Sequence, residues 1–270
     1  MISIIMGLYN CAETLEEALN SILEQTYTEW EIIMCDDGSI DNTYDIAQQF
    51  ISDHSQYKIT LLKHNVNKGL NQTLNDCLKY ANGEYIGRMD ADDISLPTRF
   101  EKELKALEKN PELAIVSCPM IYFDENGEWG KGICKNKYPH NKDLVFGTVH
   151  SHAPCLVRAE AFRAVNGYSV DKRLLRVEDW HLWIKMYALG YKGMNLTEAL
   201  YKMRDDQSAA NRRKFRYRLN EAYVSRFAVR EFALPKIYYL YSMRFIIVGI
   251  LPKFLYNFLH RNRMKLNSVK

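Results

Sequence analysis

Residues 83–93 read GEYIGRMDADD, an apolar run that ends in three carboxylates at Asp90, Asp92 and Asp93. This pattern predicts a strand that delivers the three side chains to the edge of a sheet. Carboxylates this close repel one another, so they stay ionised together only where a divalent cation or a shell of hydrogen-bond donors neutralises them. The stretch therefore predicts a cation site. The alternative is a solvated acidic turn that caps the helix after Pro97.

Strand and helix patterns alternate on both sides of this stretch. Apolar runs at 2–6, 30–35 and 59–62 predict buried strands, and helical periodicity follows each of them. Asn10 and Glu13 resemble a capping box for the first of these helices. Further along, the sequence predicts a helix at 98–109, a strand at 114–123 that enters a hairpin, loops over 128–152, a helix at 156–165, a helix that starts at Glu178 and a strand at 200–203. The alternation predicts an α/β fold with a mostly parallel central sheet flanked by helices.

Polar side chains follow several of the predicted strands directly. Tyr9, Asp36-Asp37, Lys68 and Asp90 to Asp93 each come just after a strand. In open sheets of this kind, ligands bind outside the carboxyl ends of the strands. We therefore expect these residues to converge on one rim of the sheet.

The composition is that of an ordinary globular protein. The 270 residues are 47% apolar and 26% charged, which allows one large domain with a substantial core. The six cysteines lack C-x-x-C spacing, so reduced thiols are expected rather than disulfides or zinc ligands. The first residues lack the basic start and the long apolar core of a signal peptide, so we expect a cytoplasmic protein.

The charge divides the chain into two parts. Residues 211–270 hold 14 Lys and Arg against 2 Asp and Glu, a net charge of +12, whereas residues 1–210 hold 22 against 31, a net charge of −9. We predict a catalytic domain at 1–210 and a helical, basic and aromatic segment at 211–270. The longest uncharged apolar piece of that segment, Phe245 to Pro252, is too short to span a bilayer.

Three partners are compatible with this C-terminal segment. Its cations and aromatic side chains suit the headgroup layer of an anionic membrane, so we expect peripheral attachment to the inner face of the cell membrane. Packing against a second subunit, as a homo-oligomer, is the alternative. Nucleic acid is not an expected partner, because no recognisable nucleic-acid-binding module accompanies the segment.

Five motifs occur in a characteristic order along the chain. They are Tyr9-Asn10, Asp36-Asp37-Gly38-Ser39, Asn65-x-x-Lys68-Gly69, Asp90-Ala91-Asp92-Asp93 and Glu178-Asp179-x-x-Leu182-Trp183. Their spacing over roughly residues 1–205 resembles that of the family 2 glycosyltransferases of GT-A fold. Each motif alone is a common short string, and the ordered set is far more specific.

The resemblance implies roles for three acidic residues. Asp92 would ligate Mn²⁺ or Mg²⁺, and Asp90 would contact the ribose or a water on the metal. Asp179 would be the catalytic base, although a helix N-terminus lowers the basicity of a carboxylate there. The alternative is that Glu178 and Asp179 simply begin a helix, as acidic residues often do.

Other residues are candidates on chemical grounds. Asp36 can accept the N3–H proton of uracil, which favours a uridine nucleotide, while the alternative is a turn that caps a helix. Tyr9 can pack on the base or belong to the rim of the core. Lys68 can place a positive charge near the phosphates or remain a surface lysine. His150 or His152 is a candidate to complete the metal shell, and buried or solvated histidines are the alternative. Asp205, Asp206 and Gln207 fall where the family often has a loop near the donor.

The predicted reaction is the metal-dependent transfer of a hexose from a UDP-linked nucleotide-sugar to a lipid-linked or polysaccharide acceptor in cell-surface glycan synthesis. One base and one metal-held leaving group, with no second nucleophile, imply single displacement and inversion at the anomeric carbon. A nucleotidyltransferase that makes sugar-nucleotides is one alternative, but Gly7-Leu8-Tyr9-Asn10 is a poor triphosphate-binding loop. A catalytically silent nucleotide-sugar-binding subunit is another.

Overall fold

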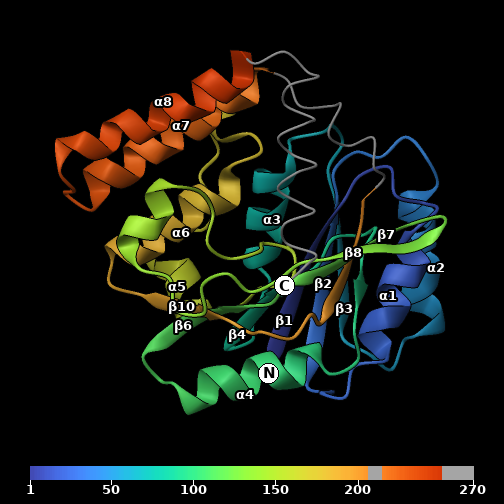
Figure 1. Cartoon of the computed structure of the whole chain (residues 1–270). Coiled ribbons are helices and arrows are strands. Elements are labelled where there is room, and N and C mark those ends of the chain that lie inside the picture. Colours follow the sequence, from blue (N-terminus) through green and yellow to red (C-terminus); the bar gives the residue numbers. More distant parts are fainter. Residues whose placement is uncertain (206–214, 251–270) are drawn as a thin grey trace.

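The computed structural model of the chain describes residues 1–205 and 215–250 (Figure 1). Within these residues, the main sheet contains seven strands in the order β10-β6-β9-β4-β1-β2-β3. β4, β1, β2 and β3 pair in parallel, and β9 pairs antiparallel with both β4 and β6. The predicted α/β fold with a mostly parallel central sheet is therefore confirmed. The strand bounds are β1 Ile2–Leu8, β2 Trp30–Asp36, β3 Ile59–Lys63, β4 Tyr85–Arg88, β6 Leu113–Ser117, β9 Leu156–Arg158 and β10 Lys192–Asn195.

A second sheet of four strands among the described residues has the order β5-β11-β7-β8. Its strands are β5 Ile94–Ser95, β7 Met120–Asp124, β8 Gly127–Lys131 and β11 Tyr201–Arg204. β11 pairs antiparallel with β5, which follows the acidic stretch directly, and parallel with β7. This pairing brings the end of the predicted strand at 200–203 beside Asp92 and Asp93.

Helices cover both faces of the main sheet (Figure 1). On one face, α1 (Leu15–Leu23), α2 (Thr43–Asp53) and α4 (Arg99–Lys109) bury apolar side chains against the sheet. On the other face, α3 (Leu70–Leu78), α5 (Ala159–Ala164) and α6 (Glu178–Ala188) do the same. Three short 3₁₀ helices, η1 (Asn141–Val145), η2 (Lys172–Leu174) and η4 (Lys236–Tyr238), lie in connections of the described chain.

A buried carboxylate aligns the first residues of three neighbouring strands. Glu31 of β2 accepts hydrogen bonds from Ser3 Oγ at 2.6 Å and from the Asn82 backbone N–H at 2.7 Å. Ser3 Oγ in turn accepts from the Gly83 backbone N–H at 2.7 Å. Burial raises the pKa of Glu31, but Lys58 and these donors outweigh it and lower the pKa overall. The register of β4 is thus fixed at its start, before the chain reaches the acidic residues.

Some predictions of local structure were wrong. Residues 114–123 form β6 in the main sheet and β7 in the second sheet, because Pro119 lacks the N–H that a continuous strand needs. Residues 156–158 form β9, since Leu156 and Val157 are buried between β4 and β6 and strand pairing overrides the helical pattern. The predicted loops over 128–152 contain β8 and η1.

The predicted capping box at Asn10 was also wrong. Asn10 has a positive φ of 49°, which asparagine tolerates better than most residues. Its Oδ1 accepts a hydrogen bond from the Ile40 backbone N–H at 2.9 Å, and its own N–H donates to Ser39 Oγ at 3.0 Å. Asn10 therefore joins the loop after β1 to the loop after β2. The N-cap residue of α1 is Thr14, which makes no side-chain capping bond.

Two further helices follow the second sheet. α7 (Phe215–Glu231) and α8 (Tyr239–Ile250) lie side by side and project from the α6 side of the molecule (Figure 1). Val224 and Ala228 of α7 are fully buried and share a hydrophobic core with α6. The division of the chain between residues 210 and 211 and the remaining tail at 251–270 lie outside the described residues, so the two-part organisation stays a prediction. Among the helices that are described, none is long and apolar enough to cross a bilayer.

We expect Gly83→Ala to destabilise the fold by about 2 kcal/mol, because an overpacked buried site costs that order of energy. An added Cβ would lie 2.7 Å from the Ser3 backbone nitrogen and 2.8 Å from the Met1 carbonyl oxygen. Urea unfolding measures the loss. Gly130→Ala is the matched control, since its Cβ would meet the Tyr122 side chain at 3.4 Å, an ordinary contact. Equal stability of the two variants would contradict the prediction.

Candidate active site

A cavity of about 580 Å³ opens at the carboxyl ends of β1 and β4. The segments that follow these strands supply most of its wall, because neighbouring parallel strands end at the same edge of a sheet. The predicted residues Tyr9, Asp90 and Asp92 all line it, so part of the expected convergence is observed. The lining residues are Gly7, Tyr9, Asn10, Cys11, Ala12, Glu13, Thr14, Asp41, Asp90, Ala91, Asp92 and Arg204.

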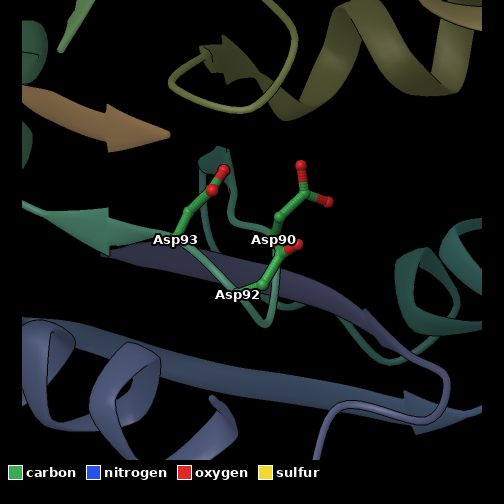
Figure 2. A group of neighbouring side chains, drawn as sticks. All are labelled: Asp90, Asp92 and Asp93. Atoms are coloured by element: carbon green, nitrogen blue, oxygen red, sulfur yellow. The ribbon is translucent and has the colours of Figure 1, made fainter. Parts of the chain in front are cut away.

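Three carboxylates gather on the loop that leaves β4. Asp90, Asp92 and Asp93 each offer an oxygen atom, and these oxygens lie within 4.8 Å of one another. Figure 2 shows the three side chains on one short turn of the backbone, with Asp90 and Asp92 close together. Asp92 is exposed, Asp90 is half-buried and Asp93 is buried. The cluster therefore has one face toward the cavity and one toward the protein interior.

Arg88 supports this cluster from the sheet. It is the last residue of β4 and is only 4% exposed. Its guanidinium group makes a bidentate ion pair with Asp90, in which Nη1 donates to Oδ2 at 2.7 Å and Nη2 donates to Oδ1. Its carbonyl oxygen accepts from Arg99 Nη2 at 3.2 Å. Arg88 therefore fixes the orientation of Asp90, and the second lone pair on each Asp90 oxygen remains able to contact a cation or a water.

Asp93 is only partly satisfied by the protein. Its Oδ1 accepts a hydrogen bond from the Arg204 backbone N–H at 2.8 Å, while its Oδ2 is buried and has no hydrogen-bond partner among the described residues. Burial, and then the charges of Asp90 and Asp92, raise the pKa of Asp93. Burial and the charge of Asp90 likewise raise the pKa of Asp92. The surroundings therefore disfavour the ionised forms of Asp92 and Asp93 in the absence of a cation.

These observations fit a divalent cation. Carboxylate oxygens are the ligands that Mg²⁺ and Mn²⁺ prefer, and a cation would neutralise the repulsion and use the free Asp93 oxygen. The predicted metal residues were Asp92, as a ligand, and Asp90, in contact with the ribose or with a water on the metal. The structure places an oxygen of Asp93 beside theirs, although the sequence predicted no separate ligand role for Asp93.

The residues predicted to read the base lie at different depths. Tyr9 is 50% exposed at the cavity, whereas Asp36, at the end of β2, is fully buried. Both carboxylate oxygens of Asp36 lie 3.4 Å from the Ser39 backbone N–H. Contact between Asp36 and a nucleobase would require the Ser39 loop to move. The predicted roles of Tyr9 and Asp36 therefore stay predictions.

Asp37, not Asp36, holds the next loop in place. Its two oxygens accept from the backbone N–H groups of Lys68 and Gly69, each at 2.8 Å. Its Oδ1 also lies 2.8 Å from His64 Nδ1, and His64 Nε2 lies 3.0 Å from Asp76 Oδ2. Lys68 is exposed and is not among the residues that line the cavity. Asp37, just after β2, therefore anchors the backbone at Lys68, while the Lys68 side chain does not line the cavity.

Asp179 lies in the first turn of α6, as predicted, and is half-buried. Its Oδ2 accepts a hydrogen bond from Thr148 Oγ1 at 3.1 Å. Burial raises the pKa of Asp179, and the Trp180 backbone N–H, Thr148 and Arg88 only partly oppose this rise. Burial and Asp179 also raise the pKa of Glu178. Arg88 acts electrostatically on both Asp92 and Asp179, while Asp179 is not among the described residues that line the cavity.

The two candidate histidines do not belong to the group of possible metal ligands found among the described residues. His150 is 1% exposed, and its Nδ1 and Nε2 contact Asn195 Oδ1 at 2.8 Å and Tyr187 Oη at 2.9 Å. His152 Nε2 contacts Tyr168 Oη at 2.8 Å. Burial lowers the pKa of both rings, to about 4 for His150, so both are neutral near pH 7. Their ring nitrogens thus contact neighbouring side chains rather than the acidic cluster.

Sequence reasoning missed Arg88, Arg204 and Asp41. A charged residue inside the apolar run at 83–89 was a usable signal for Arg88, since a buried charge requires a partner. The sequence predicted no role in the site for Asp41, but it lines the cavity and accepts from the Ala12 backbone N–H at 3.2 Å. Nothing local distinguished Arg204, because the pairing of β11 with β5 brings it to the site. Of the loop at 205–207, residues 206 and 207 lie outside the described residues.

Comparisons with known proteins agree on one relationship. The family model described as glycosyl transferase family 2 matches residues 3–165. The chain is 40% identical to EpsE of Bacillus subtilis (strain 168), named as a glycosyltransferase, over 97% of this chain and 94% of EpsE. It is 30% identical to WfgD of Escherichia coli, over 93% of this chain and 94% of WfgD. WfgD is described as a UDP-Glc:alpha-D-GlcNAc-diphosphoundecaprenol beta-1,3-glucosyltransferase.

A solved structure shares the fold. The mannosyltransferase PcManGT from Pyrobaculum calidifontis, in complex with GDP-Man and Mn²⁺, matches with a TM-score of 0.69 and 20% sequence identity. The match covers 91% of this chain and 68% of that chain. At this level of identity the likeness concerns the arrangement of the backbone.

We expect Asp92→Asn to weaken Mn²⁺ binding by at least tenfold, because it removes the exposed charge of the cluster. Isothermal titration of the purified protein with MnCl₂ measures this without any turnover. Asp124→Asn, in the turn between β7 and β8, is the control and should leave Mn²⁺ affinity unchanged. Equal Mn²⁺ affinity in the wild type and Asp92→Asn would remove the cluster as the cation site.

Proposed function

The chain belongs to glycosyl transferase family 2 and is a glycosyltransferase, and we propose that it moves a hexose from a nucleotide-sugar to a lipid-linked or polysaccharide acceptor with inversion. The single observation that carries this proposal is the acidic cluster on the loop after β4, beside the cavity. The GT-A architecture provides the frame, and the residues of the cluster and of α6 provide the chemistry.

The cluster is proposed to hold Mn²⁺ or Mg²⁺ through Asp92, Asp93 and Asp90. Such a cation supplies positive charge to the diphosphate that leaves. Arg88 orients Asp90 through the bidentate ion pair. The manganese complex of a structural neighbour is consistent with this proposal, and the oxygen-donor set of this chain supports it directly.

Asp179 is proposed to be the general base. It would take the proton of the acceptor hydroxyl while that oxygen bonds to the anomeric carbon and the bond from this carbon to the diphosphate breaks. Its raised pKa makes the Asp179 carboxylate a better proton acceptor than a solvated aspartate. The Thr148 hydroxyl, which donates to Oδ2, holds the carboxylate in one orientation. One base and one displacement give inversion.

A UDP-linked donor and a lipid-linked acceptor are the preferred substrates. WfgD, with 30% identity along nearly the whole chain, is described as using UDP-Glc and a diphosphoundecaprenol-linked sugar. Tyr9 is exposed at the cavity and available to pack on a base. Asp36 is proposed to read uracil after the Ser39 loop moves. We place the activity in the synthesis of a bacterial cell-surface polysaccharide, and a silent nucleotide-sugar-binding subunit is disfavoured because the sequence retains both Asp92 and Asp179.

We expect Asp179→Asn to lower kcat by at least 100-fold, the usual contribution of a general base, while UDP affinity stays within twofold of wild type. Transfer of radiolabelled sugar and titration with UDP measure the two effects. Glu160→Gln, an exposed acid in the first turn of α5, is the matched control. The base is lost when Asp179 is protonated. Because its pKa is raised, kcat should fall as the pH is lowered, and this fall should occur at a pH above the ordinary aspartate pKa of about 4. Full transfer by Asp179→Asn would eliminate the proposed base.

The α7–α8 hairpin is proposed to bind the anionic inner face of the cell membrane. Leu240, Met243, Ile247 and Ile250 recur at helical spacing on α8, and all are exposed, from 41% to 70%. The segment 232–250 carries Lys236 and Arg244 and no acidic residue. An apolar helix face with cations and without acids complements an anionic lipid surface. A membrane position would bring the enzyme to a lipid-linked acceptor.

We expect the double substitution Leu240→Gln, Ile247→Gln to weaken binding to phosphatidylglycerol vesicles by about tenfold or more, since two apolar side chains no longer enter the headgroup layer. Vesicle co-sedimentation measures the binding. Val66→Gln removes an exposed apolar side chain outside the hairpin and serves as the control. Unchanged vesicle binding, or a loss of dimer instead, would contradict the proposal.

A further inference from the structure

The cavity has an excess of negative charge. Among the described residues that line it, Glu13, Asp41, Asp90 and Asp92 are acidic, and Arg204 is the one Lys or Arg. A nucleoside diphosphate brings further negative charge to this site. Binding it therefore requires positive charge from the protein in addition to any metal ion. Lys68, the cation suggested by the sequence, does not line the cavity.

Arg204 is placed at the cavity edge by contacts on both sides. It ends β11, and its backbone N–H donates to Asp93 Oδ1 at 2.8 Å. Its Nε donates to the Asp92 carbonyl oxygen at 3.0 Å, and the guanidinium carbon lies 4.5 Å from the centre of the Phe123 ring. These contacts hold the cation directly beside the loop that carries the proposed metal ligands.

The remaining partner of the guanidinium group is exchangeable. Arg204 Nη2 forms an ion pair with Glu17 of α1, whose side chain is 54% exposed, while that of Arg204 is 31% exposed. An ion pair this open to water contributes little to stability, because the solvent screens it. A phosphate group offers a guanidinium two parallel charge-assisted hydrogen bonds, a stronger interaction than a solvated carboxylate provides.

We propose that Arg204 binds the diphosphate of the nucleotide-sugar, exchanging Glu17 for phosphate oxygens while Nε stays on the Asp92 backbone. The inference rests on the proposed function and adds to it a residue that recognises the leaving group. Arg204 would then stabilise the charge of the nucleoside diphosphate during transfer. It also couples that charge to the acidic loop, since one side chain contacts both.

A purely structural role makes a different prediction. If Arg204 only held the loop at Asp92 and Asp93, its loss would weaken metal binding and would disturb uridine and UDP alike. Loss of a phosphate contact weakens the binding of a ligand more when the ligand carries more phosphates. Ligands that differ only in phosphate number therefore separate the two roles.

The experiment is calorimetric titration of the full chain with UDP, UMP and uridine, first with MnCl₂ and then with EDTA. We expect Arg204→Gln to weaken UDP binding about 10- to 100-fold, to weaken UMP binding less and to leave uridine binding within twofold. Arg204→Lys keeps the charge without the planar fork and should lie between wild type and Arg204→Gln. Glu17→Gln removes the competing carboxylate, so UDP affinity should stay equal or rise. The loss in Arg204→Gln should persist in EDTA.

Several outcomes would overturn the inference. They are an equal loss of uridine and UDP binding in Arg204→Gln, a loss that disappears in EDTA, a loss of UDP affinity in Glu17→Gln, or a loss confined to Lys68→Gln. If Arg204→Gln and Arg204→Lys bind UDP as tightly as the wild type does, this inference alone is overturned. Wild-type protein that binds neither UDP nor GDP would overturn the proposed function together with it. Thermal unfolding of each variant verifies that it is folded.

Discussion

The repulsion among three carboxylates at the end of β4 is the constraint on which the site depends. Asp90, Asp92 and Asp93 lie on one short loop, and water cannot screen the buried Asp93. Two arginines partly offset this repulsion. Arg88 pairs with Asp90, and Arg204 donates to the Asp92 carbonyl oxygen and to an Asp93 carboxylate oxygen. The balance is incomplete, because one Asp93 oxygen keeps no partner among the described residues. This shortage of positive charge fits the divalent cation proposed above.

The topology of the main sheet determines what lies around this loop. Parallel pairing of β4, β1 and β2 brings their carboxyl ends to one edge, where Tyr9 lines the cavity with Asp90 and Asp92 and Asp36 is fully buried. The antiparallel strand β9 lies between β4 and β6 and leads the chain to α5 and then to α6, which carries Asp179. Arg88, at the end of β4, is in electrostatic range of both groups of acids. The proposed metal site and the proposed base therefore share one buried cation.

The C-terminal helices are tied to this arrangement rather than separate from it. α7 packs on α6 and η1 with buried Val224 and Ala228, and Arg244 of α8 donates to the Phe146 carbonyl oxygen at 3.2 Å. A surface that binds lipid on α8 would thus be rigidly connected to the helix that carries Asp179. The proposed membrane contact on α8 would therefore set the orientation of α6 relative to the lipid surface.

The sequence by itself determined the alternation of strands and helices, the acidic loop, Asp179 at the start of a helix and the family, because these follow from local periodicity and from ordered motifs. It did not determine β9, whose helical pattern gave way to pairing on both sides, or the depth of Asp36, which depends on the Ser39 loop. Only the tertiary structure brought Arg204 to Asp92, since the two residues are more than a hundred positions apart and meet through the pairing of β11 with β5. Local patterns record which side chains a segment can bury, whereas long-range strand pairing decides which charges face one another across the site.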